Sequence, residues 1–198
     1  MASTRVTTQP TTEFITLVQA KNYLRLDQTA DDDYVGDIIK RARHQCELMT
    51  GYALYTQTLL SVVETDPYQF GPFSGIHSTQ LRITLPYAPV QSIAHLFYES
   101  DSNVWTEQVD LTVFNIDYDD LPCSIILGTG QRLDAKMTPE GVFRFKVAYV
   151  AGFTAVEGAP QNIIQAMYMY LNVYYSNRDN AAEEATACNL LMQERIWQ

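Results

Sequence analysis

Acidic residues form two short runs whose carboxylates could bind a divalent cation or take part in hydrolysis. They are Asp31, Asp32, Asp33, Asp117, Asp119 and Asp120. The second run lacks the glycine and glutamate that a calcium loop of the EF-hand type places at its sixth and twelfth positions. Asp residues just before an amphipathic helix are favoured by N-capping and by the helix dipole. We therefore interpret the first run as a helix start and the second as a turn between strands.

The remaining residue types with catalytic potential form no recognisable motif. The three histidines lack HxxxH or HExxH spacing, and the three cysteines form neither a CxxC pair nor a Cys/His cluster. The sequence Gly128-Thr129-Gly130 lacks the third glycine of a nucleotide-binding loop. We predict no catalytic residue, no metal site and no cofactor. A small carboxylate-dependent hydrolase stays as an alternative, because acidic clusters with aromatic residues can form sugar sites.

Composition indicates one globular protein with an acidic surface. The chain has 198 residues, of which 46% are hydrophobic and 18% charged, and its net charge is −10. This charge disfavours general adhesion to DNA or to anionic lipid. The longest uncharged stretch, residues 158–177, contains Pro160 and several amide side chains, so we predict no membrane span. Unpaired cysteines favour a reducing, cytoplasmic setting.

The hydrophobic period divides the chain into helical and β segments. Residues 1–15 are expected to be a flexible N-terminal arm, and residues 16–198 a single domain. Helical spacing at residues 16–24 and 35–49, and again from 160 to 177 and on to 197, predicts a helical core over 16–54 and 158–198. The period changes to two in between, which predicts a β-region over residues 55–157.

Two groups of apolar residues are candidates for contact with other subunits or partners. The helix over 160–177 is apolar nearly all round, so it must be covered on more than one face. The chain end is also apolar, and termini usually fray unless they dock. The interface candidates are Met169, Tyr170, Val173, Leu190, Leu191, Ile196 and Trp197. In the Pro/Gly-rich segment 66–79, Tyr68, Phe70 and Phe73 either contact a partner or cover the β-region.

Several segments, taken in order, resemble the head-tail connector (adaptor) proteins of long-tailed bacteriophages. They are AKNYLRL at 20–26 with the acidic run at 31–33, ELMTG at 47–51, LP at 85–86, PVQSI at 89–93, VAYVAGF at 147–153, and the helix from Pro160 to YYSNR at 174–178. The order and spacing of these segments carry the resemblance. The resemblance implies an α+β fold, in which an antiparallel β-region is inserted between the second and third helices of a small helical bundle.

The resemblance also implies a structural, non-enzymatic role in the virion. Such proteins form a dodecameric ring below the portal in the phage neck, extend the DNA channel and bind stopper or tail-side proteins. The aromatic segment at 66–79 would then face the tail side. A channel that conducts DNA must not hold it, so we expect part of the acidic set named above to face the channel without specific DNA binding. Assembly would take place in the host cytoplasm, and another neck or tail-completion protein is the alternative within this class.

Overall fold

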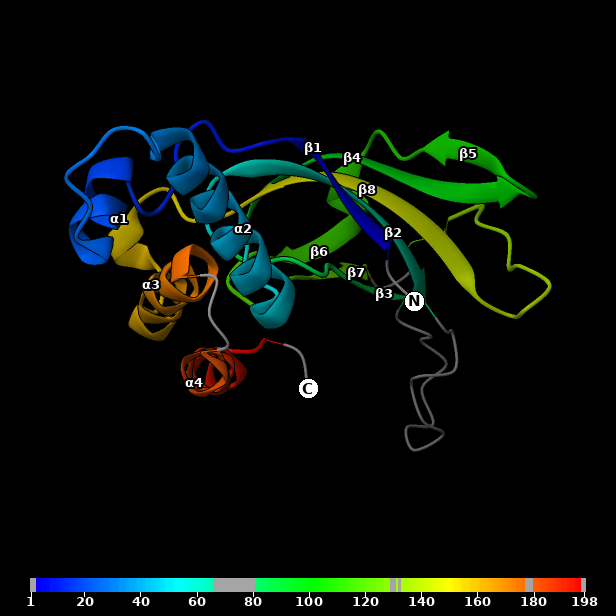
Figure 1. Ribbon diagram of the computed structural model, residues 1–198. Coiled ribbons are helices and arrows are strands. Elements are labelled where there is room, and N and C mark those ends of the chain that lie inside the picture. The colour runs from blue at the N-terminus through cyan, green and yellow to red at the C-terminus, as the bar shows by residue number, and fades with distance from the viewer. Residues whose placement is uncertain (1–2, 66–80, 129–130, 132, 177–179, 197–198) are drawn as a thin grey trace. The chain divides into compact units, whose positions relative to one another are not determined.

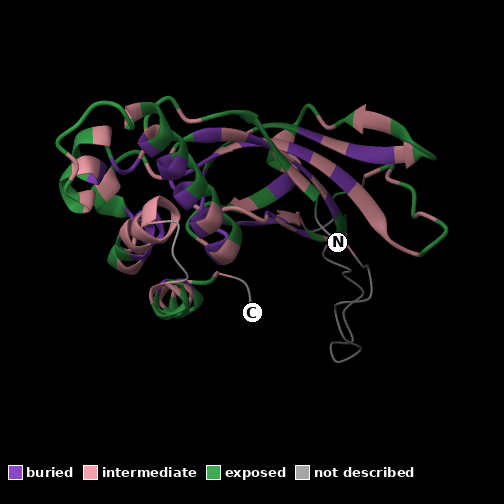
Figure 2. Cartoon of the chain, viewed as in Figure 1, coloured by how far each residue is buried: buried purple, intermediate pink, exposed green. Residues whose placement is uncertain are grey.

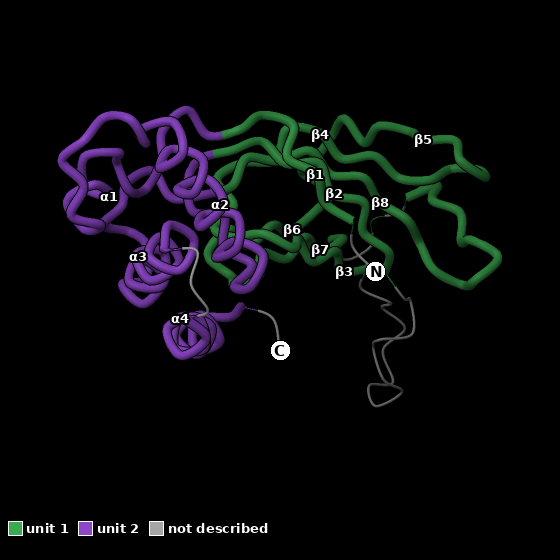
Figure 3. The backbone as a smooth tube through the Cα atoms, in the orientation of Figure 1, with its two compact units in different colours: residues 1–9, 57–151 green, residues 10–56, 152–198 purple. Residues whose placement is uncertain are grey.

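The structure is a computed structural model that describes residues 3–65, 81–128, 131, 133–176 and 180–196 (Figure 1). The chain divides into two compact units (Figure 3). We call residues 1–9 and 57–151 the β unit, and residues 10–56 and 152–198 the helical unit. The β-region is therefore inserted between the second and third helices, as the sequence predicts, and its boundaries lie at residues 57 and 151.

The helical unit contains helices α1 (Leu17–Leu24), α2 (Asp32–Thr50), α3 (Gln161–Ser176) and α4 (Ala181–Gln193), with a short 3₁₀ turn at Val156–Gly158. Thr16 and Gln19 form a capping box at the start of α1, because each side chain binds the backbone N–H of the other residue. Helix α2 ends at Gly51, whose φ of 81° is the left-handed conformation that glycine adopts at low cost.

One hydrophobic core joins the helices of this unit. The apolar positions of α2 that share one face by helical spacing are buried: Val35, Ile38, Ile39, Ala42 and Cys46. From α3, the core receives Ile163, Ala166, Met167, Tyr170 and Leu171, and from α4 it receives Ala187 and Leu191. Amphipathic spacing in α2 thus identified the buried face correctly.

The β unit consists of two antiparallel sheets. The five-stranded sheet has the order β1 (Ser3–Thr8), β2 (Gln57–Thr65), β8 (Phe143–Ala151), β4 (Val90–Asp101) and β5 (Val104–Glu107). The three-stranded sheet has the order β3 (Arg82–Thr84), β7 (Ser124–Leu127) and β6 (Phe114–Asp117), and a 3₁₀ turn at Leu111–Val113 precedes β6. Buried and half-buried residues alternate along β2 and β8 (Figure 2), so one face of the larger sheet forms a core and the other remains at the surface.

The structure differs from the predicted N-terminal arm. Residues 3–8 form the edge strand β1, which pairs with β2 from Ser3 opposite Val62 onward. The Thr4 and Ser61 hydroxyls lie 2.7 Å apart and share a hydrogen bond across this pair. A Ser/Thr-rich segment has no apolar alternation of its own, and only the neighbouring strand gives it a hydrogen-bonding partner.

Candidate interaction surfaces

Helix α3 is covered largely by helices of its own unit. Tyr170 is 1% exposed within the helical core, so its assignment to a subunit interface is corrected. Its hydroxyl lies 3.2 Å from the Cys188 sulfur in α4 and 3.5 Å from the Met49 sulfur in α2, and burial raises its pKa. Met169 also packs against the core, whereas Val173 is half-buried. The all-round apolar character of α3 is therefore explained mainly by packing between α1, α2 and α4.

The C-terminal segment docks on the helical unit itself. Leu191 is fully buried in the core, which corrects its assignment to an interface, while Leu190 and Ile196 are half-buried against the same core. The Ile196 backbone N–H donates to the Thr50 carbonyl at 2.9 Å, at the end of α2. The remaining candidate of this group, Trp197, lies outside the described residues.

The acidic run before α2 is partly engaged by neighbouring side chains. Asp31 occupies the N-cap position but makes no side-chain cap hydrogen bond, in contrast to the predicted capping role. Its carboxylate instead accepts a hydrogen bond from the Tyr175 hydroxyl at 2.9 Å, and this bond raises the Tyr175 pKa. Asp32 pairs with Lys21 at 2.5 Å, and Asp33 is exposed in the first turn. The Asp32 and Asp33 carboxylates lie in the first turn, where the positive end of the helix dipole stabilises negative charge.

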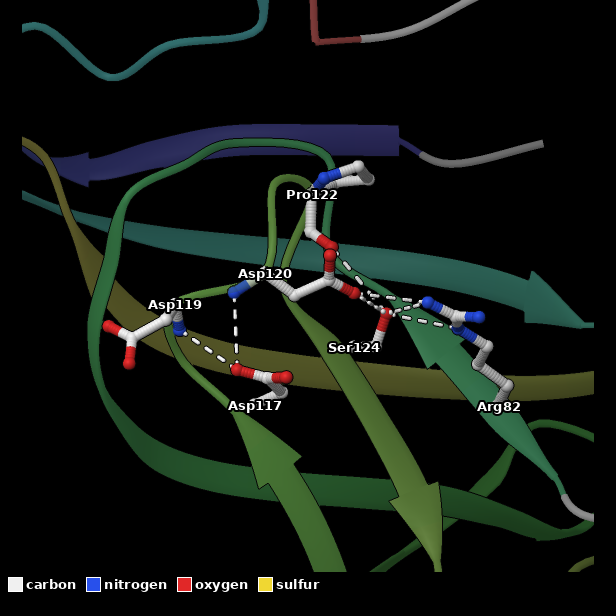
Figure 4. A network of polar contacts seen from close by, with 6 residues as sticks. All are labelled: Arg82, Asp117, Asp119, Asp120, Pro122 and Ser124. Atoms are coloured by element: carbon white, nitrogen blue, oxygen red, sulfur yellow. Dashed lines mark hydrogen bonds and ion pairs between the residues drawn. The ribbon is translucent and has the colours of Figure 1, made fainter.

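The second acidic run forms the turn between β6 and β7, as predicted, and is held by its own hydrogen bonds (Figure 4). Asp117 Oδ1 accepts from the backbone N–H groups of Asp119 and Asp120 at 3.1 and 3.2 Å. Asp120 Oδ2 pairs with Arg82 Nη2 at 3.1 Å and accepts from the Ser124 hydroxyl at 3.0 Å. The carboxylate of Asp119 points away from this network (Figure 4).

A buried charged cluster in the helical unit was not predicted from the sequence. Arg43 and Glu47 of α2 are both buried, and Arg43 Nη1 donates to Glu47 Oε2 at 3.0 Å. Arg43 Nε donates to Glu13 Oε2 at 2.8 Å, and Glu47 Oε1 accepts from the Leu54 backbone N–H at 3.0 Å. The spacing of opposite charges at i and i+4 is the available sequence signal, but it is equally typical of exposed helix faces.

The described side chains offer no evident catalytic or metal-binding arrangement. Within residues 3–65, 81–128, 131, 133–176 and 180–196, no three His, Cys, Asp or Glu side chains are placed to hold a metal ion. Burial raises the pKa of Cys123 to about 12 and raises that of Cys46, so both thiols stay protonated near neutral pH. A hollow of about 770 Å³ at the ends of β4 and β8 is lined by paired charges, including Lys136 with Asp101 and Arg144 with Glu99.

The tail-side candidates Tyr68, Phe70 and Phe73 lie outside the described residues, so their expected position stays a prediction. The helices described here include none long and apolar enough to cross a membrane.

A model of the phage gp6-like head-tail connector proteins matches residues 14–121, which is more than half of the chain. The chain belongs to this head-tail connector family. The matched range includes α1, α2 and the strands from β2 to β6, so it covers parts of both units of the connector. No curated protein sequence matches the connector.

The connector shares its fold over nearly its whole length with chains of gene transfer agent (GTA) particles. One is a chain from the neck of an empty GTA particle computed with C6 symmetry, with a TM-score of 0.70, 20% identity, and coverage of 98% of the connector and 95% of that chain. Another is from the neck of a native GTA particle computed with C12 symmetry, with a TM-score of 0.66, 19% identity, and coverage of 98% and 94%. A third, from the virion of a native GTA particle, has a TM-score of 0.65 and 22% identity, with coverage of 97% and 94%. At these identities the similarity establishes the α+β fold.

Proposed function

We propose that this connector forms a dodecameric ring in the phage neck, below the portal, where it extends the DNA channel and bridges the portal to stopper or tail-side proteins. The observation that carries the proposal is the match to the head-tail connector family. The whole-chain similarity to neck chains, in particles computed with sixfold and twelvefold symmetry, supports the ring and its location. Assembly would take place in the host cytoplasm.

The proposed role is structural rather than enzymatic. Two of the three thiols are buried and have raised pKa values, so they are poor nucleophiles near neutral pH. The two acidic runs are better explained by a helix start and by a rigid turn than by paired catalytic carboxylates. A carboxylate-dependent hydrolase therefore gains no specific support from the described residues.

We further propose that DNA passes through the ring without being held. The net charge of −10 supports this, because few phosphates would be neutralised by lysine or arginine along an acidic channel. Part of the acidic set would line the channel, and both runs leave exposed residues for this role, Asp33 before α2 and Asp119 in the turn between β6 and β7.

Light scattering of the purified protein, alone and mixed with portal protein, tests the ring. We expect a particle with a mass near twelve times the 22.5 kDa of one chain, either free or bound to the portal. Negative-stain micrographs should then show rings with a central channel. A protein that stays monomeric with and without portal, over a hundredfold range of concentration, would refute the proposal and restore the hydrolase alternative.

A further inference from the structure

The outer face of the five-stranded sheet carries side chains in registered rows. One row crosses all five strands through Ser3, Val62, Lys146, Phe97 and Glu107. Every residue in this row is exposed or half-buried, whereas the side chains that alternate with them along β2 and β8 are buried. The row therefore lies on the surface side of the sheet.

A second row, next to the first, runs through Arg5, Leu60, Ala148 and His95. Arg5 and Lys146 come together around a hollow of about 300 Å³, whose other lining residues are Ser3, Leu60 and Val62. The hollow thus combines two cationic side chains with two aliphatic ones, near the free edge of the sheet at β1.

The two cations of this hollow differ from the other charges on the same face. Arg144 is paired with Glu99 at 3.3 Å, and His95 Nδ1 lies 2.6 Å from Glu107 Oε1. Lys146 instead lies over the Trp105 ring, with Nζ 4.2 Å from the ring centroid. In the part of the chain that the structure describes, neither Lys146 nor Arg5 has a carboxylate partner. The hollow therefore suits a ligand with a carboxylate beside an apolar group.

The turn at residues 117–121 presents those two chemical groups on one rigid protrusion. Tyr118 and Leu121 are 40% and 46% exposed, so two apolar side chains flank the acidic residues of this turn at the surface. Between them, the Asp119 carboxylate points away from the hydrogen bonds that fix the turn (Figure 4). Because Asp117 holds the backbone of the turn, little conformational entropy would be lost when the turn binds.

The hollow and the turn belong to different sides of the β unit. The turn joins strands of the three-stranded sheet, and Cys123, just before β7, is close enough to influence the pKa of Tyr149, which belongs to the buried face of the larger sheet. The smaller sheet thus lies on the buried side of the larger one (Figure 1), whereas the residues that line the hollow lie on the exposed side. A chain cannot readily bring its own turn to its own hollow, but two neighbouring chains can join them.

We propose that the turn 117–121 of one copy of this protein binds the Arg5–Lys146 hollow of the next copy. The inference rests on the proposed ring and names the contact that closes it. Because two different surfaces meet, the contact is heterologous and can repeat around a ring. Asp119 would pair with Lys146 or Arg5, while Tyr118 and Leu121 would cover Leu60 and Val62.

A second copy fits this hollow better than a nucleic acid does. The hollow offers only two cationic side chains, and the whole chain carries a charge of −10. A polyanion would be repelled by this net charge, whereas the Asp119 carboxylate, which projects from the turn, would meet the two cations.

Charge reversal on each side tests the contact. Lys146→Glu and Asp119→Lys should each weaken self-association at least tenfold, measured by light scattering or sedimentation velocity, alone and with portal protein. The double variant, which restores opposite charges between copies, should recover most of the loss. Lys136→Glu and Asp134→Lys are matched controls on exposed residues of the same unit and outside the hollow, and should leave association unchanged.

Disulfide trapping locates the contact directly. A chain carrying both Lys146→Cys and Asp119→Cys should give a ladder of covalent oligomers on mild oxidation, whereas either single variant should not. Rings that persist in both charge-reversed variants, without any ladder, would overturn the inference while leaving the proposed ring intact. Duplex DNA retained by the wild type and released by Lys146→Glu would overturn it in favour of phosphate binding. A wild type that is monomeric throughout and never cross-links would refute both proposals.

Discussion

The ion pair between Arg43 and Glu47 should be the charged site whose loss destabilises the helical unit most. The two side chains are only 7% and 5% exposed. Arg43 also bonds Glu13, and Glu47 also accepts the Leu54 backbone N–H. One guanidinium therefore neutralises two carboxylates, and one of these carboxylates fixes the chain just after α2.

Removing the guanidinium leaves a buried carboxylate without its counter-charge. We expect Arg43→Met to lower the free energy of unfolding by about 3–5 kcal/mol, the usual cost of breaking a buried pair from one side. Arg43→Lys keeps the positive charge but loses one of the two charged hydrogen bonds, at a cost of about 1.5–3 kcal/mol. Adding Glu47→Gln to Arg43→Met removes the stranded charge and keeps the acceptor for Leu54, so it should recover at least half of the loss.

Urea unfolding followed by far-UV circular dichroism measures these changes as shifts of the midpoint at a constant m-value. The exposed pair of Lys40 and Asp37 on the same helix supplies the control, because Lys40→Met should change stability by only about 0.5 kcal/mol. The loss expected for Arg43→Met is a large share of the typical free energy of unfolding of a domain, about 5–15 kcal/mol. If Arg43→Met does not fold, the milder Arg43→Lys variant still allows the measurement. A cost below about 1 kcal/mol for Arg43→Met, or a double variant no more stable than the single one, would refute this reasoning.

Three further predictions concern the backbone, high pH and DNA. Gly152→Ala should lower the melting temperature several-fold more than Gly36→Ala changes it, and thermal melts compare the two. A Cβ at Gly152 would lie 2.1 Å from the Tyr55 carbonyl oxygen, and φ there is +124°. Nothing lies within 4 Å of a Cβ at Gly36. Burial raises the pKa of Tyr149, so its neutral form contributes stability that is complete below about pH 10 and lost as pH rises further. Tyr149→Phe should therefore flatten the loss of stability above that pH, and absorbance at 295 nm should show the wild-type phenol ionising on unfolding. Gel-shift assays at physiological salt should detect no appreciable binding of duplex DNA, and tight binding would show that the net charge has been misinterpreted.

Regular periodicity is the part of this fold that the sequence predicts well. The apolar residues of helix α2 repeat at helical spacing, and the change to a period of two marks the β-region that follows it. Strand β1 was missed because it is an edge strand whose pairing depends on β2.

Burial of individual polar and aromatic residues could not be predicted from their type. Arg43 and Glu47 carry charges that usually lie at the surface, yet both are buried in α2, where each supplies the other's counter-charge. Tyr170 was assigned to an outer surface, yet its hydroxyl can be buried because the Cys188 and Met49 sulfur atoms surround it. In both cases a buried polar group is stabilised by a partner that it contacts only in the folded chain, so the type of the residue alone does not predict its burial.

The distribution of uncovered surface suggests where the connector makes its subunit contacts. Helix α3 is the best sequence candidate for an interface, but its apolar side chains are covered mainly by packing inside the helical unit. Exposed large apolar residues also occur on that unit, such as Leu48 and Met192, and single residues of this kind are normal at a protein surface. The β unit instead leaves a whole sheet face open, with two cations lacking carboxylate partners among the described residues, and projects an acidic, apolar turn elsewhere. Complementary surfaces at separate places on one unit are what a closed heterologous ring requires, so substitutions in the β unit should affect assembly more than substitutions on the outer faces of the helices.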